Sequence, residues 1–310
     1  SAFAAFASAP NTAFLDSAAD GGGRGRYAYI AANPFWVLSG GEKTNPFDSL
    51  EAKLKRFPMR IDPDLPPFQG GAVGYLSYEL GRHLERLPPL VDPGLDVSDV
   101  GLGLFDTLAA FDSQTRQAWI IARETETPNR LPPEHRAQAM AARIQNVPAP
   151  GPIDWELAAT WTPELSRGEY EDIVSRGIDY IHAGDIFQAN LTQRLLSVMP
   201  QGLGPFMLSR RLRSLSPAPF SAFISAPDGT TILSASPERF LSLNTEGLVV
   251  TRPIKGTRPR GKTPGEDKAL ADELSLSEKD QAENLMIVDL MRNDLSRVCR
   301  LGSVEVSELA

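Results

Sequence analysis

The chain has 310 residues, enough for one large domain or two ordinary ones, with the composition of a soluble globular protein. Its 31 Lys and Arg against 39 Asp and Glu give a net charge of −8, which argues against a general nucleic-acid binder. One cysteine and three scattered histidines exclude a disulfide framework and a zinc-type cluster, and no apolar run is long enough to span a membrane. We expect a cytoplasmic protein without membrane contact, since the opening SAFAAFASAP lacks a cationic leader.

Short apolar runs broken by turn residues predict strands in the first part of the chain. These runs cover 25–32, 70–80, 101–112 and 117–122. The glycine-rich stretch 21–25 is interpreted as a turn, because a phosphate-binding loop should open a helix and here a strand follows. A proline-punctuated stretch, 126–152, predicts a surface connector that contains a short helix.

A well-marked helix follows the connector. Ser166 and Glu169 have capping-box spacing, an apolar stripe runs from Tyr170 to Ile181, and Gly184 ends the helix. The next run, 186–196 (IFQANLTQRLL), alternates apolar and polar residues and predicts a strand. Its polar face is either a solvated edge or the lining of a polar pocket, and the pattern leaves both open.

Strand signals continue in PFSAFISAP, TTILSASPERFLSL and LVVTRPI, with a hairpin turn at 227–230. From 266 to 298 no glycine or proline interrupts a sequence of helix formers, so this part is predicted to be helical. A body rich in strands with separate helices indicates the α+β class.

The segment 251–262 concentrates positive charge in an acidic protein. Its cations are Arg252, Lys255, Arg258, Arg260 and Lys262. The cluster fits an anion-binding site, although a solvated basic loop fits the composition equally. Lys255 differs from the arginines because only a lysine can become a neutral nucleophile.

Two carboxylates stand in informative places. Glu238 follows a predicted strand and a proline, where a solvated carboxylate is the ordinary reading. Glu283 precedes Ile287 and Leu290 at helical spacing and leans toward an apolar stripe, so its charge needs a metal ion or a partner such as Lys279.

Taken in order, the motifs GDIFQANLTQR, PFSAF, SPERF, TRPIKGTRPRG, EKDQAENLMIVDLMRNDLSRV and GSVEV resemble those of the chorismate-utilising enzymes. The resemblance is strong over 163–310 and weaker over 1–125. It implies an anthranilate synthase component I-like fold of two packed, mainly antiparallel sheets flanked by helices, incomplete here because the family continues beyond residue 310. It divides the chain into an N-terminal region, 1–150, and the first part of the chorismate-binding catalytic domain, 151–310.

The resemblance also implies roles for individual residues. Mg²⁺ would hold the ring carboxylate of chorismate, with Glu283 as its ligand and Glu278 as a second candidate. Glu238 matches the general acid that protonates the departing C4 hydroxyl. Gly256 and Thr257 match residues that lie against the ring carboxylate, and the arginines of the loop would help to hold the dianionic substrate and keep Lys255 neutral.

Other positions separate the branches of the family. Isochorismate and salicylate synthases carry a lysine where this chain has Gln188, which with Arg252 is a substrate-binding candidate. Anthranilate synthases usually have alanine at Lys255, whereas the lysine and PFSAF resemble aminodeoxychorismate synthase component I, whose lysine attacks C2 of chorismate. That branch serves p-aminobenzoate and folate synthesis with ammonia from a glutamine amidotransferase subunit.

Two alternatives stay open, an anthranilate synthase component I and an incomplete chain that acts as a binding or assembly subunit. Because the family's second Mg²⁺ carboxylate would lie beyond residue 310, we expect no turnover of chorismate by the 310 residues alone. The family's tryptophan-binding segment is matched only loosely, by FLDS at 14–17.

Overall fold

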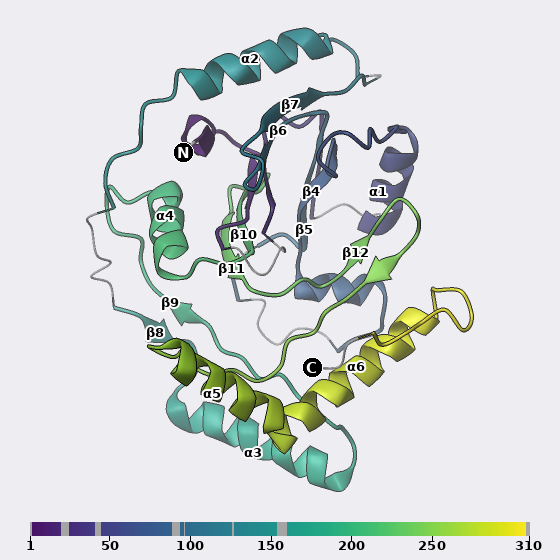
Figure 1. Cartoon of the computed structure of the whole chain (residues 1–310), viewed down its shortest axis with the longest axis vertical. Helices are drawn as coiled ribbons and strands as arrows, with labels where there is room; N and C mark the ends of the chain where they lie inside the picture. The colour runs from purple at the N-terminus through teal and green to yellow at the C-terminus, as the bar shows by residue number, and fades with distance from the viewer. Residues whose placement is uncertain are drawn as a thin grey trace.

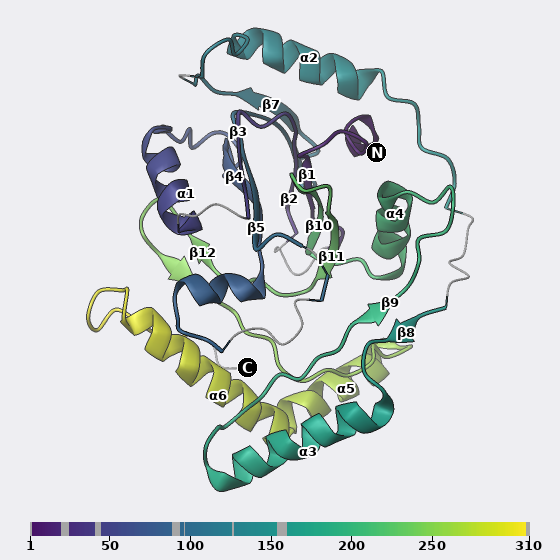
Figure 2. The same ribbon diagram turned by 180° about the vertical axis from the view of Figure 1, so that it is seen from behind.

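The computed structural model describes residues 2–19, 25–40, 45–88, 94–95, 97–125, 127–153 and 160–307. Two antiparallel sheets form the upper part of the molecule, and three helices lie at its lower end (Figures 1 and 2). The turn predicted at 21–25 lies outside the described residues, apart from Gly25. No helix among the described residues is long and apolar enough to cross a membrane.

The larger sheet has six strands in the order β11-β10-β1-β2-β6-β7, and each neighbouring pair is antiparallel. The strands are β1 (Ala13–Asp16), β2 (Tyr27–Ala31), β6 (Thr107–Asp112), β7 (Ala118–Ala122), β10 (Phe220–Ser225) and β11 (Thr231–Ser236). The first strand pairs with β10 in the register Phe14 to Phe223. Strands from both sides of residue 150 therefore share this sheet, and the division into regions 1–150 and 151–310 stays a prediction.

The smaller sheet has three strands in the order β3-β5-β4. They are β3 (Trp36–Ser39), β4 (Gly71–Leu76) and β5 (Val100–Phe105). It packs on the larger sheet through a buried cluster that includes Val73, Phe105, Leu108 and Ile224. The run predicted as one strand at 101–112 is two, β5 and β6, because the chain passes from one sheet to the other at Asp106.

Helices cover the outer faces of both sheets. On the larger sheet lie η1 (Ala2–Ala5), α2 (Pro133–Gln145) and α4 (Pro205–Leu215), whose contacts with the strands include Phe3, Met140 and Phe206. On the smaller sheet lie α1 (Pro46–Lys55) and η2 (Tyr78–His83). The N-terminal SAFAAFASAP thus contributes to the core, with Phe3 and Phe6 buried. The predicted α+β class with two packed antiparallel sheets is confirmed.

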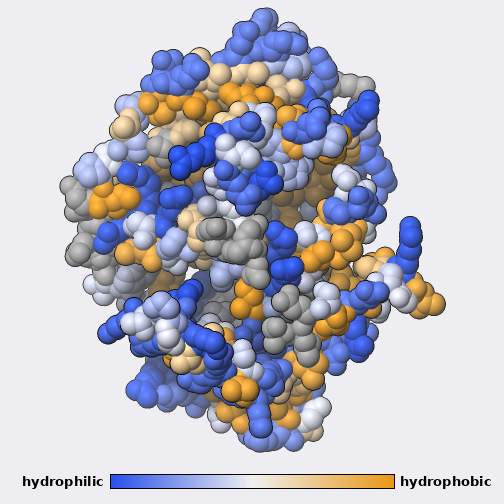
Figure 3. Space-filling view, in the orientation of Figure 1, coloured by the Kyte–Doolittle hydropathy of each residue, from blue (hydrophilic) through white to orange (hydrophobic). Residues whose placement is uncertain are grey.

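The lower part of the molecule has little core of its own. Its helices are α3 (Arg167–Ala183), α5 (Pro264–Leu276) and α6 (Glu278–Ser296), and none of their described residues is buried. Two short strand pairs lie outside the large sheets: β8 (Thr162–Pro163) with β9 (Leu195–Leu196), one on either side of α3 in sequence, and β12 (Ser242–Leu243) with β13 (Val249–Val250), which precede α5. Apolar side chains such as Ile178, Phe187 and Leu243 are exposed, and Figure 3 shows hydrophobic residues at the lower surface among hydrophilic ones.

The strand predicted at 186–196 is largely wrong, since only Leu195 and Leu196 are in a strand. Alternation alone does not make a strand, because its backbone groups need a ladder partner, and no strand pairs with residues 186–193 among the described residues. The helical stretch predicted for 266–298 is correct in type. It is divided at Ser277, whose extended backbone ends α5 and whose side chain caps α6.

Local sequence signals for turns and caps are confirmed. The Ser166 hydroxyl accepts a hydrogen bond from the Glu169 N–H at 3.3 Å, and the Glu169 carboxylate accepts one from the Ser166 N–H at 2.8 Å. Gly184 ends α3 with a φ of 81°, the left-handed conformation that glycine adopts without strain. In the β10–β11 hairpin the Asp228 carboxylate accepts a hydrogen bond from the Thr230 N–H at 2.9 Å. Each of these signals depends only on residues close in sequence.

Asp106, at the crossing between the sheets, is a fully buried charge. Its carboxylate receives two hydrogen bonds from Arg130, at 2.9 and 2.7 Å, and lies 2.6 Å from the guanidinium of Arg136. Arg136 is itself buried and donates further to the carbonyl oxygens of Leu131 and Arg123. These bonds fix α2 and the preceding segment to the crossing between the sheets.

Asp106→Ala should lower the free energy of unfolding by about 3–5 kcal/mol, because it leaves buried guanidinium groups without a counter-charge. Urea unfolding followed by tryptophan fluorescence measures this loss. Asp272→Asn is the matched control: it removes an exposed i,i+4 pair with Lys268, which is worth only about 0.3–0.5 kcal/mol. Equal losses in the two variants would contradict the role assigned to Asp106.

Candidate active site

The turn after β11 is held by short-range contacts and places Glu238. The Ser236 hydroxyl accepts a hydrogen bond from the Glu238 N–H at 3.3 Å, and Arg239 stacks over the ring of Phe220 at 5.3 Å. The Glu238 Oε1 then accepts a hydrogen bond from the backbone N–H of Ile254 at 3.0 Å. The carboxylate therefore lies against the residue that precedes Lys255, although the two are far apart in sequence.

Lys255 lies between this turn and α6. Its Nζ is 3.8 Å from Glu283 Oε1, and the two side chains are 25% and 36% exposed. The hydroxyl of Thr251, at the start of the loop, donates a hydrogen bond to the Phe240 carbonyl at 2.7 Å. Three segments distant in sequence thus bring Glu238, Lys255 and Glu283 to one place.

The acids of α5 and α6 balance much of the positive charge of the loop. Arg258 bonds Glu273 at 2.8 Å and Asp280 at 3.3 Å. Arg260 bonds the two carboxylate oxygens of Asp267 at 2.7 and 2.5 Å, and this contact lowers the pKa of Asp267 to about 2. The expectation that these two arginines serve the substrate therefore needs revision, since both are engaged with carboxylates.

Arg252 differs from those two arginines. It is exposed, and no ion pair of its side chain is recorded within the described part of the chain. Among the loop's arginines it is the one whose charge is open to an incoming anion.

The first turn of α6 packs closely against the loop. The Ser277 hydroxyl accepts a hydrogen bond from the Asp280 N–H at 3.4 Å. A hydrogen bond from the Ser277 side chain and the charge of Arg258 hold the pKa of Asp280 below its ordinary value. A cavity of about 680 Å³ opens beside this turn, and Lys255, Glu278 and Asn284 are among its lining residues.

Glu283 has a different partner from the one the sequence suggested. Among the described residues it forms an ion pair with Lys255 and not with Lys279 one turn earlier. No three carboxylate, histidine or cysteine side chains converge as a metal-binding group among the described residues. Any Mg²⁺ at Glu283 would have to complete its shell with oxygen atoms from substrate, water or other residues.

The remaining candidates are Gly256 and Thr257, which directly follow Lys255, and Gln188, which is distant in sequence. Gly256 has a φ of 70°, and a Cβ there would lie 2.7 Å from Leu274 and 2.9 Å from Asp280. Thr257 is exposed, and its carbonyl oxygen accepts a hydrogen bond from Arg258 at 2.9 Å. Gln188 lies in the irregular segment after α3, with a recorded contact to Asn190 at 3.5 Å and none to the 251–262 loop among the described residues.

Asp280 and Glu273 were missed by the sequence reading. Asp280 stands three residues after Ser277, the spacing of a helix cap, and this signal could have placed the start of α6. Nothing in the sequence indicates that Arg258 reaches both helices, because that contact depends on how the loop folds back over them.

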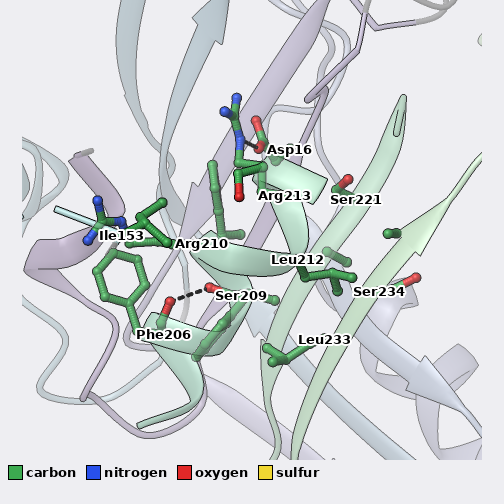
Figure 4. Close-up of a pocket in the computed structure, with 15 residues that line it drawn as sticks. Asp16, Ile153, Phe206, Ser209, Arg210, Leu212, Arg213, Ser221, Leu233 and Ser234 are labelled. Atoms are coloured by element: carbon green, nitrogen blue, oxygen red, sulfur yellow. Dashed lines mark hydrogen bonds and ion pairs between the residues drawn. The ribbon is translucent and has the colours of Figure 1, made fainter. Parts of the chain in front are cut away.

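A second cavity, of about 440 Å³, lies between α4 and strands β1, β10 and β11 (Figure 4). Phe14 and Asp16 of the FLDS segment line it, and Arg213 forms an ion pair with Asp16 across it. The Ser209 hydroxyl donates to the Phe206 carbonyl within α4. Lys255, Glu238 and Glu283 do not line this cavity, so it is separate from the candidate active site.

Comparisons with known proteins show the family of the chain. The family model for chorismate binding enzyme matches residues 12–310. The chain is 42% identical to anthranilate synthase component 1 of Thermus thermophilus and 39% identical to aminodeoxychorismate synthase component 1 of Salmonella typhimurium, in both cases over 86% of its length. It covers 57% and 55% of these two proteins, so it spans little more than half of their length.

A solved structure gives the same result for the fold. The crystal structure of anthranilate synthase component I from Streptococcus pneumoniae matches with a TM-score of 0.76 and 26% identity, covering 91% of this chain and 64% of that one. Family model, sequence relatives and fold all agree. The chain therefore belongs to the chorismate binding enzyme family.

Proposed function

We propose that this chain carries the chorismate-aminating centre of an aminodeoxychorismate synthase component I. The observation that supports the proposal is the meeting of three groups: Glu238 is bonded to the backbone next to Lys255, and Lys255 Nζ lies 3.8 Å from Glu283. A potential nucleophile, a potential proton donor and a potential metal ligand thus share one place. That combination suits substitution on a dicarboxylate ring.

Lys255 supports the aminating branch over the anthranilate branch. Relatives from both branches are similar to the chain at comparable identity, 42% and 39%, so overall similarity does not separate them. The lysine stands where anthranilate synthases usually have alanine, and a lysine, unlike an alanine, can form a covalent bond to the ring. Anthranilate synthase component I is the second candidate, supported by the Thermus relative and the Streptococcus structure.

In the proposed reaction the neutral amine of Lys255 attacks C2 of chorismate, and the hydroxyl leaves from C4 with a proton from Glu238. Ammonia then adds at C4, and Lys255 is expelled from C2. The covalent intermediate divides one difficult substitution into two easier steps. The hydrogen bond from Ile254 N–H fixes one oxygen of Glu238, which leaves the other oxygen to hold the proton.

Mg²⁺ is part of this proposal and fits Glu283 as a single carboxylate ligand. When bound, it would hold the ring carboxylate of the substrate, with Glu278 in the same region of α6. Arg252 would add an exposed positive charge for the substrate's other carboxylate, with the backbone of Gly256 and Thr257 nearby. A glutamine amidotransferase subunit is the proposed source of ammonia, and the cytoplasm remains the predicted location.

The proposed activity belongs to the whole enzyme, since the chain spans little more than half of its curated relatives. The exposed apolar residues of the lower part, among them Phe240 and Leu290, would then be covered by further polypeptide. The same exposure favours the open alternative of a binding or assembly subunit. Titration with chorismate and Mg²⁺, with and without an amidotransferase partner, distinguishes an enzyme from such a subunit.

With chorismate but no ammonia, the enzyme should accumulate a covalent adduct on Lys255, which intact mass and peptide mapping would locate. Glu238→Ala should slow adduct formation and turnover by about 10²–10⁴-fold, because the departing hydroxyl loses its proton donor. Lys255→Ala should fold but give slow or altered products. Wild-type rates and the same aminated product in Lys255→Ala would show that this lysine is only one cation of a basic loop.

Glu283→Gln should raise the Mg²⁺ concentration required for chorismate binding, because one charged oxygen ligand is lost. Calorimetric titration of chorismate at several Mg²⁺ concentrations measures this change. Glu273→Gln is the control, since Glu273 is another glutamate of this region that contacts Arg258 rather than Lys255. An unchanged Mg²⁺ dependence in Glu283→Gln would assign Glu283 a purely structural ion pair.

Without ammonia, chorismate and Mg²⁺ should yield no isochorismate, because Gln188 cannot act as the water-activating base that a lysine supplies in isochorismate synthases. Chromatography of the products tests this expectation. Isochorismate as the main product would overturn the assignment to the aminating branch.

A further inference from the structure

Arg258 ties the loop that carries Lys255 to two helices at once. Its guanidinium donates to Glu273 of α5 at 2.8 Å and to Asp280 of α6 at 3.3 Å, and a third hydrogen bond reaches the Thr257 carbonyl at 2.9 Å. Side-chain exposure is 17% for Asp280 and 61% for Glu273. The contact with Asp280 is therefore the better shielded of the two ion pairs.

Asp280 contacts the loop a second time, at Gly256. The left-handed backbone of this glycine approaches α6 so closely that a Cβ would lie 2.9 Å from the Asp280 Cγ and 2.7 Å from Leu274. One carboxylate thus touches the residue directly after Lys255 and pairs with the residue three positions after it. These two contacts leave the loop little freedom to slide along α6.

Asp280 also lies one turn before Glu283 on the same helix. Residues three apart are neighbours on a helix surface, so the carboxylate that holds the loop and the carboxylate that faces Lys255 share one face of α6. The cap from Ser277 to the Asp280 N–H fixes the start of this helix. Any shift of the loop relative to Asp280 therefore changes the distance between Lys255 and Glu283.

We propose that Asp280 is a positioning residue, which through Arg258 and Gly256 holds Lys255 at the place from which its amine reaches the ring of chorismate. This inference rests on the proposed function. The lysine side chain is long and flexible, so the fold controls its nucleophile chiefly through the backbone position. A misplacement of about 1 Å costs about 100-fold in rate when reacting groups must meet at near-contact distance.

The test compares Asp280→Asn with Asp267→Asn. Asp267 is the matched control because it also pairs with an arginine of the loop, Arg260, and its carboxylate accepts a hydrogen bond from the backbone N–H of Gly261 in the same loop. Its contacts lie farther along the loop from Lys255. We expect Asp280→Asn to lower kcat and the rate of Lys255 adduct formation by about 100-fold with little change in the KM for chorismate. Asp267→Asn should leave both rates unchanged.

Arg258→Gln and the double variant with Asp280→Asn complete a mutant cycle. If Arg258 and Asp280 act through their mutual contact, the double variant should lose no more of the adduct rate than Asp280→Asn alone. Asp280→Glu keeps the charge and should recover part of the adduct rate. The folded fraction of every variant, measured by urea unfolding, corrects the rates.

Each other outcome contradicts the proposal. Unchanged adduct formation in Asp280→Asn, or a loss that only follows the loss of folded protein, would leave Asp280 a structural residue. A raised Mg²⁺ requirement would make it a metal ligand instead. Absence of any adduct in the parent enzyme would refute the proposed function itself, and so separates that failure from failure of the positioning role.

Discussion

The pairing of β1 with β10 is the constraint on which the arrangement depends. It pairs residues 13–16 with residues 221–224 in register. Parts of the chain that are about 200 residues apart in sequence therefore form one six-stranded sheet. Because β11 pairs with β10, the end of β11 is fixed relative to this sheet. Glu238 follows that end by two residues, so the six-stranded sheet positions the candidate proton donor.

The lower helices contribute charge rather than core. None of the described residues of α5 and α6 is buried, yet four of their carboxylates pair with cations of the 251–262 loop: Asp267, Glu273, Asp280 and Glu283. Next to Lys255, the loop is held by the ion pairs of Arg258 and by the close approach of Gly256, while the pair of Asp267 with Arg260 lies farther along it. A loop attached in this way keeps its backbone geometry, while Lys255 and Arg252 stay accessible from solvent.

Sequence reasoning predicted well what neighbouring residues determine. The Ser166 capping box, the Asp228 hairpin and most strands of the two sheets follow from local patterns and are present in the structure, whereas strands β1 and β3 were not predicted. It failed where a contact with a segment distant in sequence determines the local structure. The 186–193 stretch alternates like a strand, but no strand pairs with it among the described residues. The bond between Glu238 and Ile254 N–H likewise has no signature in the sequence. Motif resemblance grouped the candidate residues, but only the fold gives their distances.

The loop has two kinds of contact, which differ in interaction energy. An ion pair at about 4 Å is worth about 1 kcal/mol in bulk water, and exposed pairs contribute about 0–1 kcal/mol to stability. The partly exposed contact between Lys255 and Glu283 is therefore weak and readily exchanged for contacts with a substrate or a metal ion. The attachment at Arg258 and Gly256 combines several hydrogen bonds with close packing against Asp280, so it can persist while Lys255 changes partners. A reactive lysine needs both properties, a fixed backbone and a side chain whose resting partner is easily displaced.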